Sequence, residues 1–211
     1  MREPREPFFL FDGPQDAALT LVLAHGAGGP MDSSYMNVVA HGVAERGFRV
    51  ARFEFPYMRA RREEGKRKGP DSALVLAAAW HAAVGALGGG ERLVIGGKSM
   101  GGRIASMVAD ELGVRGLVCL GYPFHPPGQP DRLRTAHLAA LRTPTLIVQG
   151  TRDPFGGPDE VAGYTLSPAI RLVWIEDGDH SLKPRASSGR GERQNLEAAV
   201  EAVADFLRSV S

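Results

Sequence analysis

Short apolar runs alternate along this chain with longer segments of helical periodicity. The runs are rich in Val, Ile and Leu, and glycine or proline follows each of them. Near-continuous apolar strands that alternate with helices are typical of a mostly parallel sheet covered by helices on both faces. The predicted strands are residues 19–23, 50–55, 93–95, 116–120, 145–148 and 170–175, with residues 8–11 as a candidate edge strand.

Helix candidates fill the intervals between these runs. The segment 192–209 is the clearest, because an apolar stripe runs from Leu196 to Leu207 at i, i+3 and i+4 spacing. Asp32 and Asp71 stand where N-caps are expected. The predicted helices are residues 33–46, 72–87, 100–112, 132–141, 158–165 and 192–209.

Two segments have an unusual composition. Residues 72–90 carry no charge, but their apolar run is shorter than the roughly 18–20 residues that span a bilayer, and His81 interrupts it. We predict a buried or half-buried helix there, with a dimer face as the alternative. Arginine, lysine and glutamate crowd residues 59–68, which predicts a solvated loop and leaves a binding role as the less favoured alternative.

Length, charge and cysteine usage limit the classes of protein. The 211 residues fit one domain, residues 1–211, and a net charge of +1 argues against a nucleic-acid binder. Cys119 is the single cysteine, which fits a reducing compartment, and residues 1–14 lack the apolar core of a secretory signal. We therefore expect a cytoplasmic monomer or homodimer that binds neither nucleic acid nor membrane.

The strongest chemical signal is the motif Gly97-Lys98-Ser99-Met100-Gly101, which matches G-x-S-x-G. A predicted strand precedes it and a helical pattern begins at Met100. The turn needs glycine on both sides, because a Cβ there would collide with neighbouring backbone. The helix N-terminus offers amide groups to a developing oxyanion. The motif predicts Ser99 as a nucleophile and the Met100 amide as an oxyanion donor.

A base and an acid follow in the order that such a nucleophile needs. A serine hydroxyl is a poor nucleophile until a base takes its proton. His180 follows the predicted strand 170–175, and Asp153 follows the strand 145–148. The order Ser, Asp, His, each just past the carboxyl end of a strand, is that of α/β-hydrolases. The sequence therefore predicts a triad of Ser99, Asp153 and His180.

A glycine-rich turn, His25-Gly26-Ala27-Gly28-Gly29, follows the strand 19–23. Such a turn brings a backbone amide close to the nucleophile and completes an oxyanion hole. Ala27 is the favoured second donor, and Gly28 is the next choice. The side chain of His25 is predicted to bond the loop rather than to transfer protons, since His180 already supplies a base.

Several further residues have two open interpretations. Asp177 and Asp179 are rival acids, but they lie too close to His180 in the chain to reach the far side of its ring, so they are predicted to shape the turn. Arg103 is predicted to form a structural ion pair, with an anionic ligand as the alternative. Lys98 either pairs with a nearby loop or lines the pocket floor. Gly28 is predicted to line a substrate pocket. Five residues on loops after strands either line that pocket as well or pack within their loops: Tyr57, Met58, Tyr122, Phe124 and His125.

The chain resembles the dienelactone-hydrolase-like branch of the α/β-hydrolase superfamily. The segments that carry the resemblance are residues 25–29, 55–57, 96–103, 121–125, 149–155 and 177–180. More narrowly, the chain is similar to small bacterial hydrolases related to the hydrolase-like domain of a subunit of the nonspecific-lethal chromatin complex. The resemblance implies an α/β-hydrolase fold and the same triad, but no particular substrate. The interval before Thr145 is short, so we expect no lid domain and an open site.

Other classes of site fit the sequence less well. A P-loop ending at Ser99 needs glycine where Arg92 stands, and a dinucleotide turn needs glycine where Met31 stands. The dispersed histidines predict no metal, and no cofactor is expected. The sequence predicts a serine hydrolase that cleaves a small-molecule acyl ester through an acyl-enzyme, with a non-catalytic binding or scaffold protein of the same fold as the alternative.

Overall fold

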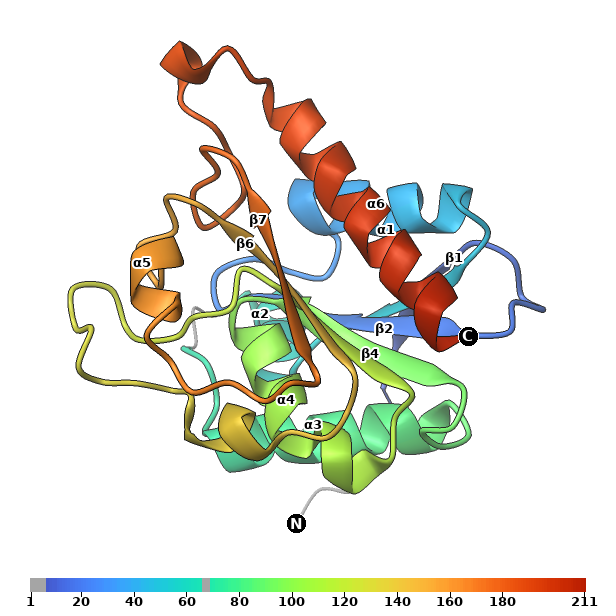
Figure 1. The fold of residues 1–211 in the computed structure, drawn as a ribbon. Helices are drawn as coiled ribbons and strands as arrows, with labels where there is room; N and C mark the ends of the chain where they lie inside the picture. The colour runs from blue at the N-terminus through green and yellow to red at the C-terminus, as the bar shows by residue number, and fades with distance from the viewer. Residues whose placement is uncertain (1–6, 66–68) are drawn as a thin grey trace.

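A seven-stranded, mostly parallel sheet lies between two layers of helices (Figure 1). The computed structural model describes residues 7–65 and 69–211. The strand order is β1-β3-β2-β4-β5-β6-β7, and only β1 is antiparallel to its neighbour. This confirms the predicted α/β class. The strands are β1 (Phe9–Asp12), β2 (Thr20–Ala24), β3 (Arg49–Phe53), β4 (Leu93–Lys98), β5 (Gly116–Leu120), β6 (Thr145–Gly150) and β7 (Ile170–Ile175).

Helices cover both faces of the sheet, which explains why the inner strands are mostly apolar. Every residue of β2, β5 and β6 is buried. One core lies beneath α1 and α6, and the other lies beneath α3 and α4 (Figure 1). The helices are α1 (Ser34–Glu45), α2 (Pro56–Glu64), α3 (Ala73–Ala86), α4 (Met100–Leu112), α5 (Pro158–Val161) and α6 (Glu192–Val210), with short 3-10 turns η1 (Ala136–Ala140) and η2 (Ala186–Ser188).

The predicted N-caps are wrong by one residue. Ser33 caps α1 and Ser72 caps α3, where the Ser72 hydroxyl accepts a hydrogen bond from the Val75 amide at 3.5 Å. Asp32 does not cap, because its carboxylate accepts hydrogen bonds from Arg62 at 2.7 and 3.0 Å. A tertiary ion pair therefore takes the side chain away from the helix terminus.

Two predicted helices are much shorter than expected. The segment 132–141 contains only the 3-10 turn η1, because the Arg134 amide bonds to the Phe124 carbonyl at 2.7 Å instead of a helical carbonyl. The segment 158–165 keeps only α5. Beyond it, the amides of Gly163 and Tyr164 bond three residues back, so the chain leaves the helix in a turn.

The charge density of residues 59–68 predicts a solvated loop, and this prediction is wrong for the described part of the segment, where α2 lies. The predicted strand ends at Phe53, and α2 begins at Pro56 and ends at Glu64. Gly65, the residue after the helix, has φ +66°. Proline at the start and glycine after the end are favourable helix boundaries. Residues 66–68 of that predicted loop lie outside the described residues. The charges therefore occupy a short helix beside the sheet.

The segment where hydrolases often carry a lid is short. Residues 121–144, all of which the structure describes, connect β5 to β6 and contain η1 as their single regular element. No lid domain interrupts them, which confirms the prediction. The uncharged segment 72–90 forms α3, with Trp80 buried against the core and Leu74 81% exposed. Within the described ranges, no helix is both long and apolar enough to cross a membrane.

Candidate active site

Ser99 occupies a strained turn between β4 and α4. Its φ of 49° and ψ of −113° lie in a region that side-chain-bearing residues rarely adopt. A Cβ on Gly97 would lie 2.1 Å from the carbonyl oxygen of Ala24, and one on Gly101 would lie 2.4 Å from the same oxygen. Both glycines are therefore required by the close approach of β2, which confirms the steric reason predicted for the motif.

The structure brings Ser99, His180 and Asp153 into one chain of hydrogen bonds. The distance from His180 Nε2 to Ser99 Oγ is 2.8 Å. On the other side of the ring, His180 Nδ1 lies 2.8 Å from Asp153 Oδ2 and 3.0 Å from Oδ1. The Asp153 side chain is fully buried, whereas 22% of the His180 side chain is exposed. The imidazole can therefore exchange protons with Ser99 while a buried carboxylate orients it.

Besides His180, two protein groups hold the carboxylate of Asp153. The Phe155 amide donates to Oδ1 at 2.9 Å, and Gln149 Nε2 donates to Oδ2 at 2.9 Å. Gln149 lies in β6, is completely buried, and also accepts from the Tyr122 amide at 2.7 Å. Sequence analysis missed Gln149. Its signal was a polar residue inside an otherwise apolar strand, which normally has a buried hydrogen-bond partner.

The rival acids have other partners. Asp177 accepts hydrogen bonds from the amide and the guanidinium of Arg185, and these contacts lower the pKa of its carboxyl group. Asp179 Oδ1 accepts from the amides of Ser181 and Lys183 at 2.8 and 3.0 Å. Both carboxylates therefore shape the loop that carries His180, as predicted for them.

A cavity of about 340 Å³ opens beside Ser99 and His180. Gly28, as predicted, lies on its wall, and so does Ala27. Helix α1 and the loops after β6 and β7 complete the lining. The residues around the cavity are Gly26, Ala27, Gly28, Gly29, Ser33, Tyr35, Met36, Lys98, Ser99, Phe155, His180 and Ser181.

The pocket role predicted for Tyr57, Tyr122 and His125 is wrong, because all three side chains point into the protein. The Tyr57 hydroxyl donates to the Ala27 carbonyl at 3.0 Å. The Tyr122 hydroxyl donates to the carbonyl of Arg134 at 2.9 Å, and His125 Nε2 lies 2.8 Å from a carboxylate oxygen of Glu160. The same lining lacks Met58 and Phe124, which are buried in the core.

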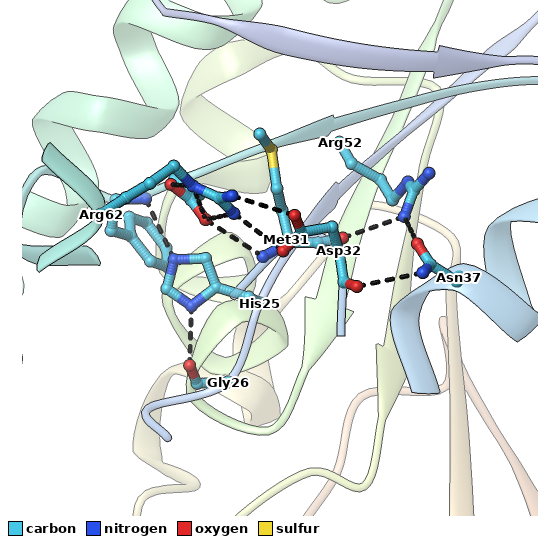
Figure 2. A network of polar contacts seen from close by, with 9 residues as sticks. His25, Gly26, Met31, Asp32, Asn37, Arg52 and Arg62 are labelled. Carbon is cyan, nitrogen blue, oxygen red and sulfur yellow. Dashed lines mark hydrogen bonds and ion pairs between the residues drawn. The ribbon is translucent and has the colours of Figure 1, made fainter. Parts of the chain in front are cut away.

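The glycine-rich turn after β2 is held by His25. Its Nε2 accepts from the Phe55 amide at 3.1 Å, and its Nδ1 donates to the Gly26 carbonyl at 2.7 Å (Figure 2). Burial lowers the pKa of His25, so the ring stays neutral in this arrangement. Within the described part of the chain, the amides of Ala27 and Met100 have no hydrogen-bond partner. Both are therefore free to bind an oxyanion.

A network of ion pairs holds the rest of this turn in place (Figure 2). Arg62 of α2 donates to both Asp32 and Glu54, and this pairing raises the pKa of its guanidinium. Arg52 of β3 donates to the Met31 carbonyl at 3.0 Å. Helix α2, which lies where a loop was predicted, therefore anchors the segment that leads from the glycine-rich turn into α1.

The two cations near Ser99 differ in their surroundings. Arg103 Nη1 contacts Met107 Sδ at 3.7 Å, and no carboxylate of residues 7–65 or 69–211 pairs with it, so the predicted ion pair is wrong. Lys98 satisfies both of its predicted alternatives, since it lines the cavity and donates to the main-chain oxygen of His180. Cys119 is buried in β5, and burial raises the pKa of its thiol, in keeping with an inert core position.

A parallel sheet with Ser, Asp and His side chains meeting at its carboxyl edge defines the class of α/β-hydrolase folds. A family model described as "Alpha/beta hydrolase domain" matches residues 17–208, so the chain belongs to this family. The match covers every strand from β2 to β7 and nearly all of α6.

Individual relatives agree with this placement. The chain is 31% identical over 168 residues to the putative protein-lysine deacylase ABHD14B of Rattus norvegicus, covering 79% of this chain and 76% of that protein. Its fold is similar to a lidless α/β serine hydrolase from Xanthomonas campestris (TM-score 0.67, 19% identity, covering 98% of this chain and 95% of that one). It is also similar to dienelactone hydrolase from Anabaena variabilis (TM-score 0.71, 20% identity, covering 97% and 99%).

Proposed function

We propose that this protein is a serine hydrolase that cleaves a small acyl ester or thioester through a Ser99–His180–Asp153 triad. The single observation that supports this most is the 2.8 Å separation of Ser99 Oγ from His180 Nε2, with Asp153 on the other ring nitrogen. A base within hydrogen-bond reach activates the hydroxyl, and a third group orients the base. The finer resemblance to relatives of the nonspecific-lethal complex subunit stays a prediction, as do a cytoplasmic location and a monomeric or dimeric state.

The proposed reaction has two half-cycles. Ser99 Oγ attacks the acyl carbon while His180 Nε2 takes its proton, and the carbonyl oxygen becomes an oxyanion facing the amides of Ala27 and Met100. His180 then gives the proton to the leaving alcohol or thiol, which leaves an acyl group on Ser99. Water, deprotonated by His180, attacks that acyl-enzyme, and Ser99 recovers its proton as the acid departs. Asp153 keeps the proton of His180 on Nδ1 and stabilises the imidazolium.

The cavity favours a small acyl group. Its volume is about 340 Å³, and glycine and alanine of the turn after β2 form one wall. Pockets for drug-sized ligands have volumes of about 300–1,000 Å³, so this one is at the small end. The rat relative is named as a putative protein-lysine deacylase, which makes an acylated lysine side chain a second candidate substrate. Both substrates transfer an acyl group to the same serine.

A fluorophosphonate probe and p-nitrophenyl acetate test the proposal directly. We expect the probe to label the wild-type protein and not Ser99→Ala, while Ser209→Ala, a change at an exposed serine of α6, is labelled like the wild type. Asp153→Asn should lower kcat by up to about 10⁴-fold, because the amide favours the wrong imidazole tautomer. A folded wild-type protein that neither reacts with the probe nor releases p-nitrophenol would instead support the non-catalytic alternative.

A further inference from the structure

Lys98 links the strand of the nucleophile to the loop of the histidine. It is the last residue of β4 and immediately precedes Ser99. Its Nζ donates a hydrogen bond to the main-chain oxygen of His180. In the described part of the chain, no other hydrogen bond to that oxygen is found. The side chain therefore spans from one member of the proposed triad to the backbone of another.

The groups around the ammonium bring it close to the His180 carbonyl. Gly121, with φ +68°, lies directly against it, and a Cβ there would be 2.9 Å from both Lys98 Nζ and the His180 oxygen. The ring of Tyr35 in α1 faces Nζ at 5.4 Å. The nearby anionic groups are Asp153 and Asp179, which act at longer range than hydrogen bonds. A glycine in the left-handed region thus creates the space in which the ammonium meets the carbonyl.

We propose that Lys98 is a positioning residue of the hydrolase, holding the backbone of His180 so that its imidazole stays in line with Ser99. This role rests on the proposed function. The contacts close a ring: from Ser99 through the Lys98 side chain to the His180 carbonyl, and from the imidazole Nε2 back to Ser99 Oγ at 2.8 Å. A closed ring of this kind limits how far the nucleophile and the base can separate.

Contacts other than that of Lys98 also hold the histidine loop. Asp179 caps its turn through the amides of Ser181 and Lys183, and Asn195 of α6 donates to the carbonyls of Glu176 and Leu182. Burying an ammonium costs free energy that an apolar side chain of the same length would avoid. The desolvated charge is therefore better explained by the position of His180 than by the stability of the loop.

The ammonium also introduces a dependence on pH. Burial lowers the pKa of Lys98 to about 8, although Asp153 and Asp179 oppose this effect. Burial raises the pKa of the adjacent Tyr35, so that phenol stays protonated in the same range. Above pH 8 the lysine becomes a neutral amine, whose hydrogen bond to the carbonyl is weaker than a charge-assisted one. The wild-type rate of Ser99 acylation should therefore fall as the pH rises through 8.

Lys98→Met removes the ammonium and keeps an unbranched side chain. We expect kcat for p-nitrophenyl acetate to fall about 10- to 100-fold with little change in KM, as small misplacements of catalytic groups do. The rate of fluorophosphonate labelling should fall in parallel, and its decline above pH 8 should disappear. Lys183→Met, at an exposed lysine of the same loop, should keep the wild-type rate and pH profile.

Two results would overturn this role. One is a folded Lys98→Met protein with the wild-type kcat, and the other is one that retains the decline above pH 8. If Lys98→Met does not fold, Lys98→Gln decides, because it keeps an N–H donor without charge. An intermediate rate without the alkaline decline supports the role, and a wild-type profile refutes it. Failure of the proposed function is distinct, because then the wild-type protein itself is not labelled at Ser99.

Discussion

Replacing Gln149 tests how the fold holds the buried carboxylate of the triad. Gln149 Nε2 donates to Asp153 Oδ2 at 2.9 Å and to the Tyr122 carbonyl at 3.1 Å, while Oε1 accepts from the Tyr122 amide at 2.7 Å. The residue is completely buried. Gln149→Leu has a similar volume and removes all of these hydrogen bonds, so its effect reports on the polar contacts rather than on packing.

The expected loss of stability follows from the groups left behind. A buried amide without an acceptor, here that of Tyr122, costs about 1–3 kcal/mol. A lost hydrogen bond to a charged group, here Asp153, costs about 1.5–3 kcal/mol. The free energy of unfolding should therefore decrease by about 2.5–6 kcal/mol. For a domain of this size each kcal/mol lowers the melting temperature by about 2–4 °C, so we expect a decrease of about 5–24 °C.

Gln149→Glu separates the charge from the hydrogen bonds. It keeps an acceptor for Tyr122 but places a second carboxylate beside Asp153, which raises the pKa of the introduced group. A carboxyl group whose folded pKa exceeds its unfolded value of about 4.3 binds more protons in the folded state. Its penalty is therefore absent below the unfolded pKa, grows as the pH rises from the unfolded to the folded pKa, and is constant above it. The difference in melting temperature from the wild type should widen between pH 5 and pH 8.

Thermal unfolding followed by circular dichroism at three pH values measures both effects. Gln129→Leu, at an exposed loop position, is the control and should stay within about 0.5 kcal/mol of the wild type. The reasoning is wrong if Gln149→Leu melts like this control. It is also wrong if the deficit of Gln149→Glu is the same at pH 5 and pH 8.

Two further predictions concern the elbow and the turn after β2. Gly101→Ala should abolish probe labelling and lower the melting temperature, because its Cβ would lie 2.4 Å from the Ala24 oxygen. Gly85→Ala, whose Cβ would lie in open space, should instead stabilise α3 by about 0.4–1 kcal/mol, and equal effects of the two changes would contradict this reasoning. The lowered pKa of His25 contributes stability above pH 6.5 that is lost as the pH falls below it, so the wild-type melting temperature should decrease from pH 7 to pH 5. This decrease should be less steep in His25→Gln than in His81→Gln, a change at an exposed histidine, and identical slopes in the two variants would refute the reasoning.

The sheet and the elbow were predictable because their physical requirements leave a local record. A strand buried on both faces must be apolar at every position, as in β5, whose bounds match the predicted residues 116–120. The elbow needs glycine wherever the Ala24 carbonyl approaches. Chain order then brings Ser99, Asp153 and His180 to one edge, since parallel strands share the direction of their carboxyl ends.

Features that depend on contacts between distant segments were not predictable. Helix α2 is short and highly charged, and what favours it is the pairing of Arg62 with Asp32 and Glu54. Glu54 is near in the chain, but Asp32 lies before β3, and a window along the chain does not show that these two carboxylates meet at Arg62. The same holds for Tyr57 and Tyr122, which follow strands as pocket residues often do but point toward backbone carbonyls inside the protein.

The residues that hold the triad follow a pattern that unites these observations. Lys98 and Gln149 both lie in the last two residues of parallel strands, one immediately before Ser99 and the other four residues before Asp153. A side chain at that place is half-buried, as in Lys98, or fully buried, as in Gln149, so a polar one finds its partner in a neighbouring loop. Lys98 donates to His180, and Gln149 donates to Asp153. Polar residues that end apolar strands are therefore the positions where a sequence of this fold should be searched for groups that orient the catalytic ones.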